Sequence, residues 1–407
     1  MKNNQAIKHT IVTLLDTPAY GGAEQYVLDS SEILNRNGHK TIIYTNNEQV
    51  KKRYLEFISK NKIKNFKVKQ LPFVLDAIGN WKGLLKFFVH APFACIWLYS
   101  ELSTLQKTEK NILCWLVGFT DRLALSPIIK RLHIPLIWVD IGPLQPIFTR
   151  NWKFPEFLYK LTKKYPDHFT TTSQFTLKSM MQEANICKKN ITLVYPGVHT
   201  FTQKQILHFK KKGNIWRKKN ITAEILVGFV GRMATENEVD LLLTAFAKSV
   251  QQTKKRMQLV LIGDGPEKMR FEKLAANLAI SDKVIFTGFV SAQKKFSILA
   301  ACDVFVFSRA WSWDGFGITT IEAMSVGTPV ITSNFGPQKE IVLHNFNGIH
   351  FKPHDAQDLA KKIILLANSK KLRKKISTHG IQTVHKNFSY KVMEDALLTA
   401  LKKVIKL

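Results

Sequence analysis

Two carboxylates stand close together in a glycine-rich stretch, SWDGFGITTIEAMSVGTPVI, at 312–331. Asp314 comes directly before Gly-Phe-Gly, and Glu322 follows eight positions later. Glycines let a ligand approach the backbone, and the N–H groups that open a following helix can bind a phosphate. The backbone groups of interest belong to Gly315, Phe316, Gly317, Ile318 and Thr319. Taken alone, Glu322 is equally a favourable first-turn charge and Asp314 an ordinary loop acid, so their interpretation depends on the surrounding elements.

The pattern around this stretch places it at the end of a strand. Short apolar runs alternate with helical patterns in the C-terminal half, at 224–230, 258–263, 283–288, 303–308, 329–333 and 348–351. Fully apolar strands joined by helices predict a parallel sheet that is covered on both faces and doubly wound. Residues 309–317 then form the loop at the carboxyl end of the strand 303–308, and a helix begins near Gly317 and ends before Gly327.

The N-terminal half repeats this α/β pattern less regularly. We expect strands at 9–15, 40–45, 111–117, 135–140, 168–173 and 191–196. The turn at Pro196-Gly197 predicts a boundary near residue 200, which gives one domain at 1–200 and another at 201–388. The polar helix at 389–407 is expected to pack back on the N-terminal domain. Two such domains facing each other would bind a ligand in the cleft between the carboxyl ends of their sheets.

Two other features at expected strand ends suit an anionic ligand. Gly21 and Gly22 follow the first strand and open a helix, whose N-terminus favours a phosphate, although a plain strand–helix turn explains them equally well. The absence of G-x-G-x-x-G there disfavours a nicotinamide cofactor. Arg232 ends the first strand of the second half, where its guanidinium could bind a diphosphate; the alternative is a surface arginine.

The net charge of +30 favours anionic partners: phosphates, nucleic acid or an acidic membrane face. The alternative is lysine spread over solvated surfaces, and we interpret the lysine-rich 209–219 as a solvated linker. Four scattered cysteines at 95, 114, 187 and 302 disfavour disulfides or a zinc site and fit a reducing cytoplasm. The first residues do not resemble a secretory signal, so we expect a cytoplasmic protein.

The most apolar segment is LLKFFVHAPFACIWLYS at 84–100. Lys86, His90 and Pro92 interrupt it, and it falls short of the roughly 20 apolar residues that a membrane span needs. We interpret it as a core helix. The alternative is a patch on a membrane surface, which would make the protein peripheral at the inner face of the plasma membrane.

The order of motifs along the chain resembles a known family. GGAEQ lies near the start and VYPGV at the domain junction, followed by VGR, LVLIGDGP, VIFTGFV, ACDVFVFS, DGFGITTIEAMSVGTPVI and NGIHF. This order is similar to that of the retaining nucleotide-sugar glycosyltransferases of family 4, which have the GT-B fold of two Rossmann-like domains. The resemblance covers nearly the whole chain, is dense from about 225 to 355, and is thin between 50 and 165.

The resemblance implies a hexosyltransferase-type enzyme in cell-surface polysaccharide or glycolipid synthesis. Its substrates would be a UDP- or GDP-linked sugar donor and a glycan or lipid-linked acceptor, with no metal or other cofactor and no nucleic-acid partner. Catalysis is expected from Arg232 on the diphosphate, Glu322 on the ribose and Asp314 near the donor sugar. Further donor contacts are expected from Gly21, Gly22, Phe289, Val290, Gly315, Phe316, Gly317, Ile318 and Thr319.

The chain departs from the family pattern at several of these places. The pattern G-R-x-x-x-x-K-G has Asn237 and Glu238 where lysine and glycine are usual. Loss of that cation would cost on the order of 2–4 kcal/mol of transition-state stabilisation, and Lys339 is a candidate replacement. Asp314 stands where glutamate is usual, and the preceding loop carries two aromatic residues suited to sugar stacking or to anchoring the loop. The candidate acceptor-side residues are Asp140, at the place of a family histidine, Trp311 and Trp313.

These departures leave a second interpretation open. A GT-B protein that has lost catalysis would serve as a glycan-binding or partner subunit, and the missing lysine is the main argument for it. Donor affinity separates the two readings, because an enzyme must bind a nucleotide sugar.

Overall fold

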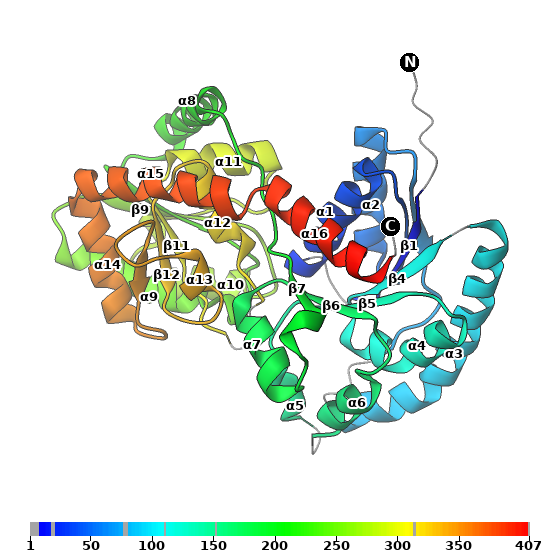
Figure 1. Cartoon of the computed structure of the whole chain (residues 1–407). Coiled ribbons are helices and arrows are strands. Elements are labelled where there is room, and N and C mark those ends of the chain that lie inside the picture. The colour runs from blue at the N-terminus through cyan, green and yellow to red at the C-terminus, as the bar shows by residue number, and fades with distance from the viewer. Residues whose placement is uncertain are drawn as a thin grey trace. The chain divides into compact units, whose positions relative to one another are not determined.

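The computed structural model describes residues 8–17, 21–75, 80–109, 111–150, 153–311 and 315–405. The chain divides into two compact units (Figure 1): unit 1 comprises Met1–Pro196 with Met393–Leu407, and unit 2 comprises Gly197–Val392. Each unit is built on one parallel sheet, and helices connect its strands. The chain therefore has the α/β class expected from its alternating apolar runs.

Unit 1 contains a seven-stranded sheet in the order β3-β2-β1-β4-β5-β6-β7. Its strands are β1 (Thr10–Leu15), β2 (Lys40–Thr45), β3 (Phe66–Gln70), β4 (Ile112–Leu116), β5 (Leu136–Asp140), β6 (His168–Thr171) and β7 (Ile191–Leu193). Its helices are α1 (Gly22–Arg36), α2 (Glu48–Asn61), α3 (Trp81–Thr108), α4 (Phe119–Arg131), α5 (Gln145–Phe148), α6 (Phe154–Thr162) and α7 (Gln174–Glu183), with the 3-10 turn η2 (Lys188–Asn190). All strand pairs are parallel; β1, for example, pairs with β2 from Thr10 opposite Lys40 to Leu15 opposite Thr45.

Unit 2 contains a six-stranded sheet in the order β10-β9-β8-β11-β12-β13. Its strands are β8 (Ile225–Val230), β9 (Met257–Ile262), β10 (Val284–Phe286), β11 (Val304–Phe307), β12 (Val330–Ser333) and β13 (Ile349–Phe351). Its helices are α8 (Gln203–Asn220), α9 (Val239–Gln252), α10 (Lys268–Asn277), α11 (Ala292–Ala301), α12 (Ile318–Ser325), α13 (Gln338–Ile341), α14 (Ala356–Asn368) and α15 (Lys370–Asn387), with η3 (Thr235–Asn237) and η4 (Ser281–Lys283). The last helix, α16 (Tyr390–Val404), begins just before the unit boundary, and in unit 1 Asn37 Nδ2 donates to Glu394 Oε1 at 2.6 Å.

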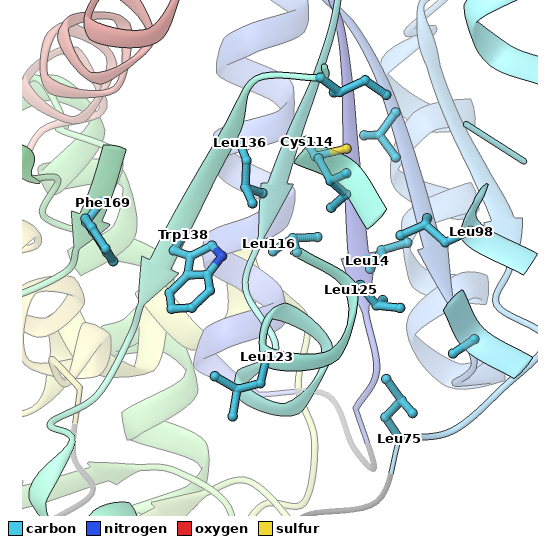
Figure 2. Packing of buried hydrophobic residues seen from close by; sticks show 14 of the residues in the cluster. Leu14, Leu75, Leu98, Cys114, Leu116, Leu123, Leu125, Leu136, Trp138 and Phe169 are labelled. Atoms are coloured by element: carbon cyan, nitrogen blue, oxygen red, sulfur yellow. The ribbon is translucent and has the colours of Figure 1, made fainter. Parts of the chain in front are cut away.

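The core of unit 1 forms because its central strands are mostly apolar, with Thr10, Thr13 and Asp140 as their polar residues. β1, β4 and β5 are buried along their whole lengths. Figure 2 shows Leu14, Leu116 and Trp138 from these strands packed with Leu125 of α4 and Leu98 of α3. This packing fixes the strand ends, and with them the loops that follow, in unit 1.

The structure corrects the interpretation of 209–219 as a linker, because these residues lie in helix α8. Thr202 caps the helix by accepting a hydrogen bond from Gln205 N, and Gln205 Oε1 accepts one from Thr202 N. At Gly213 the helix lies against α11 so closely that a Cβ would be 2.0 Å from the carbonyl oxygen of Ser297. The lysines therefore belong to one side of a helix whose other side packs on unit 2.

The interpretation of 84–100 as a core helix is also wrong in part. This segment lies in α3, which buries Phe87, Ala94 and Leu98 but turns a row of larger apolar side chains outward. α3 is the one helix in the described part of the chain that is long and apolar enough to cross a membrane, judged by length and composition. Only 22% of its most apolar 18-residue window is buried, so α3 packs on unit 1 along one side.

Candidate active site

In unit 2 the strand order changes direction between β8 and β11. The chain builds β8, β9 and β10 outward in one direction and then returns to place β11 on the other side of β8. Ligands of open α/β sheets bind at the carboxyl ends of strands at such a point. The loops that follow β8 and β11 carry most of the residues predicted from the sequence in this unit, including Arg232 and Gly317.

The loop after β8 is fixed by close backbone contacts with the loop after β9. Gly231 N donates to Ile262 O at 3.0 Å, and Met233 N donates to Asp264 O at 2.9 Å. A Cβ at Gly263 would lie 2.0 Å from Gly231 O, so only glycine permits this approach. The turn 263–266 therefore supports the loop that carries Arg232.

Arg232 is half-exposed at the end of β8, as the sequence predicts for its position. Its guanidinium forms an ion pair with Glu236, four residues later. Burial opposes ionisation of Glu236, but a backbone hydrogen bond and the charges of Arg232 and Arg309 hold its pKa below the usual range. Two cations therefore act on one carboxylate at this edge of the sheet.

Arg309, two residues after β11 ends at Phe307, was not a sequence candidate. Its Nη1 donates to Asn237 Oδ1 at 3.4 Å, and its guanidinium lies 5.0 Å from the ring centroid of Trp311. Ser308 Oγ also donates to Asn237 O at 2.8 Å. The loop after β11 is thus tied to the loop after β8 at the position where the family pattern has lysine.

Lys339, the replacement cation suggested by the sequence, is exposed on α13. Its charge acts on His350 of β13, where it helps burial to lower the pKa of that imidazole. Arg309 donates to Asn237, so the structure adds Arg309 as a candidate for the missing cation, and the role of Lys339 stays a prediction. The sequence held a signal for Arg309, since an arginine directly after a buried strand occupies the same kind of position as Arg232.

The turn into α12 is held by one buried side chain, Gln338. Its Nε2 donates to Phe316 O at 2.9 Å, and its Oε1 accepts from Thr320 Oγ1 at 2.9 Å. Gly317 has a φ of +93°, and a Cβ there would be 2.1 Å from Gln338 Nε2. The Phe316 ring is buried 5.5 Å from that of Phe388, measured between ring centroids, so it anchors the loop in unit 2. Gly315, Gly317, Ile318 and Thr319 are partly exposed around this turn.

Glu322 lies in α12 and is mostly buried. Its Oε1 binds Lys295 Nζ of α11 at 2.5 Å, a contact that the sequence did not suggest. A carboxylate has further acceptor capacity beyond one ammonium contact, so Glu322 can also accept hydrogen bonds from hydroxyl groups. The pair with Lys295 orients this carboxylate.

Three other candidates of unit 2 lie near these loops or outside the described residues. Phe289 follows β10 and is 72% exposed, while Val290 is half-buried against an apolar cluster. An exposed ring at a strand end could pack against a nucleotide base. Asp314 and Trp313 lie outside the described residues, so their expected roles stay predictions.

In unit 1, Gly21 and Gly22 are exposed where the loop after β1 enters α1. Gly21 N donates to Glu24 Oε2 at 2.7 Å, and Thr17 Oγ1 donates to Glu24 Oε1 at 2.7 Å. β1 and β4 are neighbours in the sheet although five helices and strands separate them in sequence, so this too is a point where the strand order reverses. The glycine pair therefore has the strand-end position that the sequence predicts.

Asp140, the candidate for contact with an acceptor, is buried at the end of β5. Its Oδ1 accepts from Arg122 Nη2 at 2.5 Å, and its Oδ2 accepts from Tyr159 OH at 2.8 Å. Arg122 is also buried and donates from Nη1 to Val139 O at 2.7 Å. Burial and the carboxylate of Asp140 raise the pKa of Tyr159. The structure thus gives Asp140 an interior ion pair rather than an exposed carboxylate.

Asp121 is an acid that the sequence analysis missed. It lies in the first turn of α4, fully buried, and burial together with the charge of Asp16 raises its pKa to about 8. A Cβ at Gly118 would be 2.3 Å from Asp121 Oδ2, so a glycine must precede this helix. Nothing in the local sequence distinguishes Asp121 from an ordinary first-turn acid, because its burial arises from tertiary packing.

The described residues contain no group of three or more His, Cys, Asp or Glu side chains that could hold a metal ion. The site in unit 2 is instead made of arginines, backbone groups at a helix start, and one oriented carboxylate. This arrangement is suited to a ligand that carries phosphate and hydroxyl groups.

Known proteins match the chain in sequence. Residues 211–383 match the family described as Glycosyl transferases group 1. Two uncharacterised glycosyltransferases of Methanocaldococcus jannaschii align with it: MJ1178 at 30% identity over 68% of this chain and 69% of the relative, and MJ1069 at 26% identity over 59% of each. LpsE of Rhizobium meliloti, a lipopolysaccharide core biosynthesis glycosyltransferase, is 35% identical over 35% of this chain and 41% of that protein.

Solved structures match it in fold. Anabaena Alr3699/HepE, crystallised in complex with UDP and glucose, superposes with a TM-score of 0.75 at 17% identity, over 97% of this chain and 99% of that chain. At this identity the likeness shows the fold, which is the GT-B class of two Rossmann-like parallel-sheet domains. Because the chain is 30% identical to MJ1178 over more than two thirds of that relative, it belongs to the family of glycosyl transferases group 1.

Proposed function

We propose that this glycosyltransferase moves a sugar from a UDP- or GDP-linked donor to a glycan or lipid-linked acceptor and retains the configuration at the anomeric carbon. One observation carries the proposal. Arg232 and Arg309 follow neighbouring strands at their carboxyl ends, and Arg309 donates to Asn237 in the loop that carries Arg232. Two guanidinium groups at this edge of an open α/β sheet suit a diphosphate. The UDP complex of HepE and the lipopolysaccharide role of LpsE support a nucleotide-linked donor and a cell-surface glycan acceptor.

The reaction breaks the bond between the anomeric carbon and the diphosphate and joins that carbon to an acceptor hydroxyl oxygen. In a retaining transfer the acceptor enters on the face from which the diphosphate leaves, so the departing phosphate oxygen can take the acceptor proton. The charge that develops there meets Arg232, Arg309 and the N-terminus of α12, which is positively polarised. Because these groups supply fixed positive charge, we propose that no metal ion or other cofactor takes part.

The remaining donor contacts follow from the same geometry. Glu322 accepts hydrogen bonds from the ribose hydroxyls while Lys295 holds its Oε1. Phe289 borders the base with its exposed ring. Asp314 contacts the donor sugar, and the tryptophans of the loop 309–313 contact the acceptor. We assign the protein to the cytoplasm, which fits its four free cysteines, and we expect no nucleic-acid partner.

A non-catalytic protein of the same fold is the second candidate, and Asn237 in place of lysine is the observation that favours it. The contact between Arg309 and Asn237 weakens that argument, because it supplies a cation at the same place. Calorimetry with UDP- and GDP-sugars decides between them, since a protein that only binds glycans has no need of donor affinity.

The test of the proposed function is a screen of nucleotide sugars for release of nucleoside diphosphate. Glu322→Ala is expected to abolish release. Arg309→Gln is expected to lower kcat/KM for the donor by about 30- to 900-fold, which corresponds to the loss of about 2–4 kcal/mol from one charge-stabilising group. The matched control is Arg256→Gln, because Arg256 is exposed at the amino end of β9 in the same sheet. Full turnover in Arg309→Gln would remove Arg309 from the site, and turnover in Glu322→Ala would remove Glu322.

A further inference from the structure

Helix α3 carries a continuous row of exposed apolar side chains. Its members follow one another at spacings of three or four residues, or adjoin, and therefore lie along one side of the helix. Each is between 47% and 71% exposed: Trp81, Leu85, Phe88, Val89, Phe93, Ile96 and Tyr99. The residues that α3 buries, such as Phe87, Ala94 and Leu98, lie on its opposite side. The residues of the last two turns that are not buried are polar, so the exposed row ends at Tyr99.

Helix α6 extends this apolar surface. The Phe88 ring of α3 lies 6.0 Å from the ring of Phe154, measured between centroids, and Phe154 lies 6.4 Å from Phe157. Phe157 and Leu161 are 60% and 50% exposed on α6. We call the seven side chains on α3 together with Phe157 and Leu161 the α3–α6 face. An exposed apolar surface of this extent on a folded domain marks an interaction site.

Within α3 and the segment 153–164, most of the charged residues are lysines. α3 has Lys82 and Lys86 in its first two turns and no acid before Glu101. The segment 153–164 around α6 contains four lysines and one acid, Glu156, which forms an ion pair with Lys160. An apolar surface bordered by lysines and containing Trp and Tyr is complementary to the interfacial region of an anionic bilayer.

The packing of α3 indicates that it lies on a bilayer rather than across it. A helix of 28 residues is about 42 Å long, which exceeds the roughly 30 Å of a hydrocarbon core. To cross the bilayer, however, α3 would have to leave the core of unit 1, where Leu98 and Leu102 are buried. The exposed row can enter the interface while the buried side stays packed, because the two lie on opposite sides of one helix.

We infer that the α3–α6 face docks this protein on the surface of an anionic lipid bilayer. The apolar side chains enter the boundary between headgroups and acyl chains, and Lys82 and Lys86 bind the anionic headgroups. This inference does not depend on the identity of the sugar donor or on turnover. It names the surface through which a lipid-linked acceptor in the same bilayer would be brought to unit 1.

The test measures binding of the full-length protein to sedimented vesicles of phosphatidylcholine alone and of phosphatidylcholine mixed with phosphatidylglycerol. The protein is expected to bind the mixed vesicles more strongly. The double variant Leu85→Ser with Ile96→Ser is expected to lower the partition coefficient by about tenfold for each side chain. The double variant Lys82→Gln with Lys86→Gln is expected to lower it by about fivefold for each lysine, on mixed vesicles only.

Two matched controls test whether exposed apolar side chains or lysines elsewhere on the protein affect vesicle binding. Leu55→Ser removes a 46% exposed leucine from α2 of the same unit and is expected to leave binding unchanged. Lys371→Gln with Lys375→Gln removes two exposed lysines at the same i, i+4 spacing from α15 and is also expected to have little effect. Light scattering gives the oligomeric state of each variant.

Equal binding by the wild type and the Leu85/Ile96 variant would overturn the inference, as would failure of the wild type to bind either vesicle. The inference would also be overturned if the wild type were a dimer that does not bind vesicles and if the double variant Leu85→Ser with Ile96→Ser were a monomer. The face would then join two copies of the chain. The substituted side chains are exposed, so circular dichroism should show that the variants keep their fold.

Discussion

Replacement of Asp140 by asparagine tests whether this residue is an acid of the active site or part of the interior of unit 1. The structure favours the interior, because Asp140 and Arg122 are 1% and 3% exposed and their side chains meet at 2.5 Å. Asparagine keeps the shape of the side chain and one acceptor oxygen but removes the charge. Arg122 would then be a buried guanidinium without its carboxylate partner, since its Nη2 donates to Asp140 in the wild type.

The expected cost follows from that uncompensated charge. Removing one partner of a buried ion pair destabilises a protein by about 3–5 kcal/mol. We expect the lower part of this range, because asparagine can still accept from Arg122 and because three aromatic rings, those of Phe119, Trp138 and Tyr159, lie 5.2, 5.4 and 5.5 Å from the guanidinium. Tyr159→Phe removes only the hydroxyl that donates to Asp140 and should lower the free energy of unfolding by about 1 kcal/mol.

The measurement must report unit 1 separately, because two units can unfold in separate steps. Native-state hydrogen exchange of the full-length protein, read by mass spectrometry on peptides that cover β5, gives the opening free energy of that segment. A double-mutant cycle with Arg122→Met should show coupling, with the second substitution costing less after the first. Unchanged protection of β5 in Asp140→Asn, together with loss of sugar transfer, would refute the structural interpretation and return Asp140 to the acceptor side.

Two further predictions concern Asp121 and Gly317. Folding raises the pKa of Asp121 from 3.8 to about 8, so the folded protein binds this proton more tightly than the unfolded chain does. The free energy of unfolding should therefore fall as pH rises from about 4 to about 8, by up to about 1.4 kcal/mol per pH unit. Asp121→Asn should remove this part of the slope in urea titrations at several pH values, and an unchanged slope would contradict the assignment. Gly317→Ala should lower the free energy of unfolding by about 2–4 kcal/mol, because it forces alanine into a left-handed conformation and displaces Gln338 with its two hydrogen bonds. Gly21→Ala should lower it by less than about 1 kcal/mol, because the backbone there is extended and the nearest contact is at 3.4 Å. Equal thermal shifts for the two alanine variants would show that the turn adapts.

The sequence predicts the interior strands because they are short runs of mostly apolar residues, as in the strand that ends at Phe307. It does not reveal β3, whose alternating lysines and valine suit an edge strand with one exposed side. The lysine content of 209–219 led to the wrong interpretation of α8 as a linker. The features that stabilise α8 as a helix are the cap at Thr202 and the close packing of Gly213 on a helix about eighty residues later. Composition reports charge, whereas these contacts depend on the fold.

In the candidate site, too, the sequence locates single residues but not the residues that contact them. Arg232 and Glu322 can be located from sequence because each is placed by the end of a predictable strand or the start of a helix. Their partners cannot, because Lys295 reaches Glu322 from another helix and Gln338 reaches Phe316 from beyond the next strand. Interior ion pairs are equally invisible: nothing near Asp140 in sequence shows that Arg122 will bury beside it.

The two departures at 237 and 238 are best understood as one linked change. Glu238 keeps a φ of +48°, the left-handed conformation that favours the glycine of the family pattern. Its Oε1 accepts from Ala310 N at 3.1 Å and lies 3.2 Å from His354 Nδ1, contacts that offset the strain. Asn237 in turn binds Arg309 and Ser308, so both replaced residues hold the loop after β11. Asn237, which stands where the family pattern has a cation, thus binds the neighbouring loop. In the donor site that we propose, Arg309 of that loop is the second positive group beside Arg232.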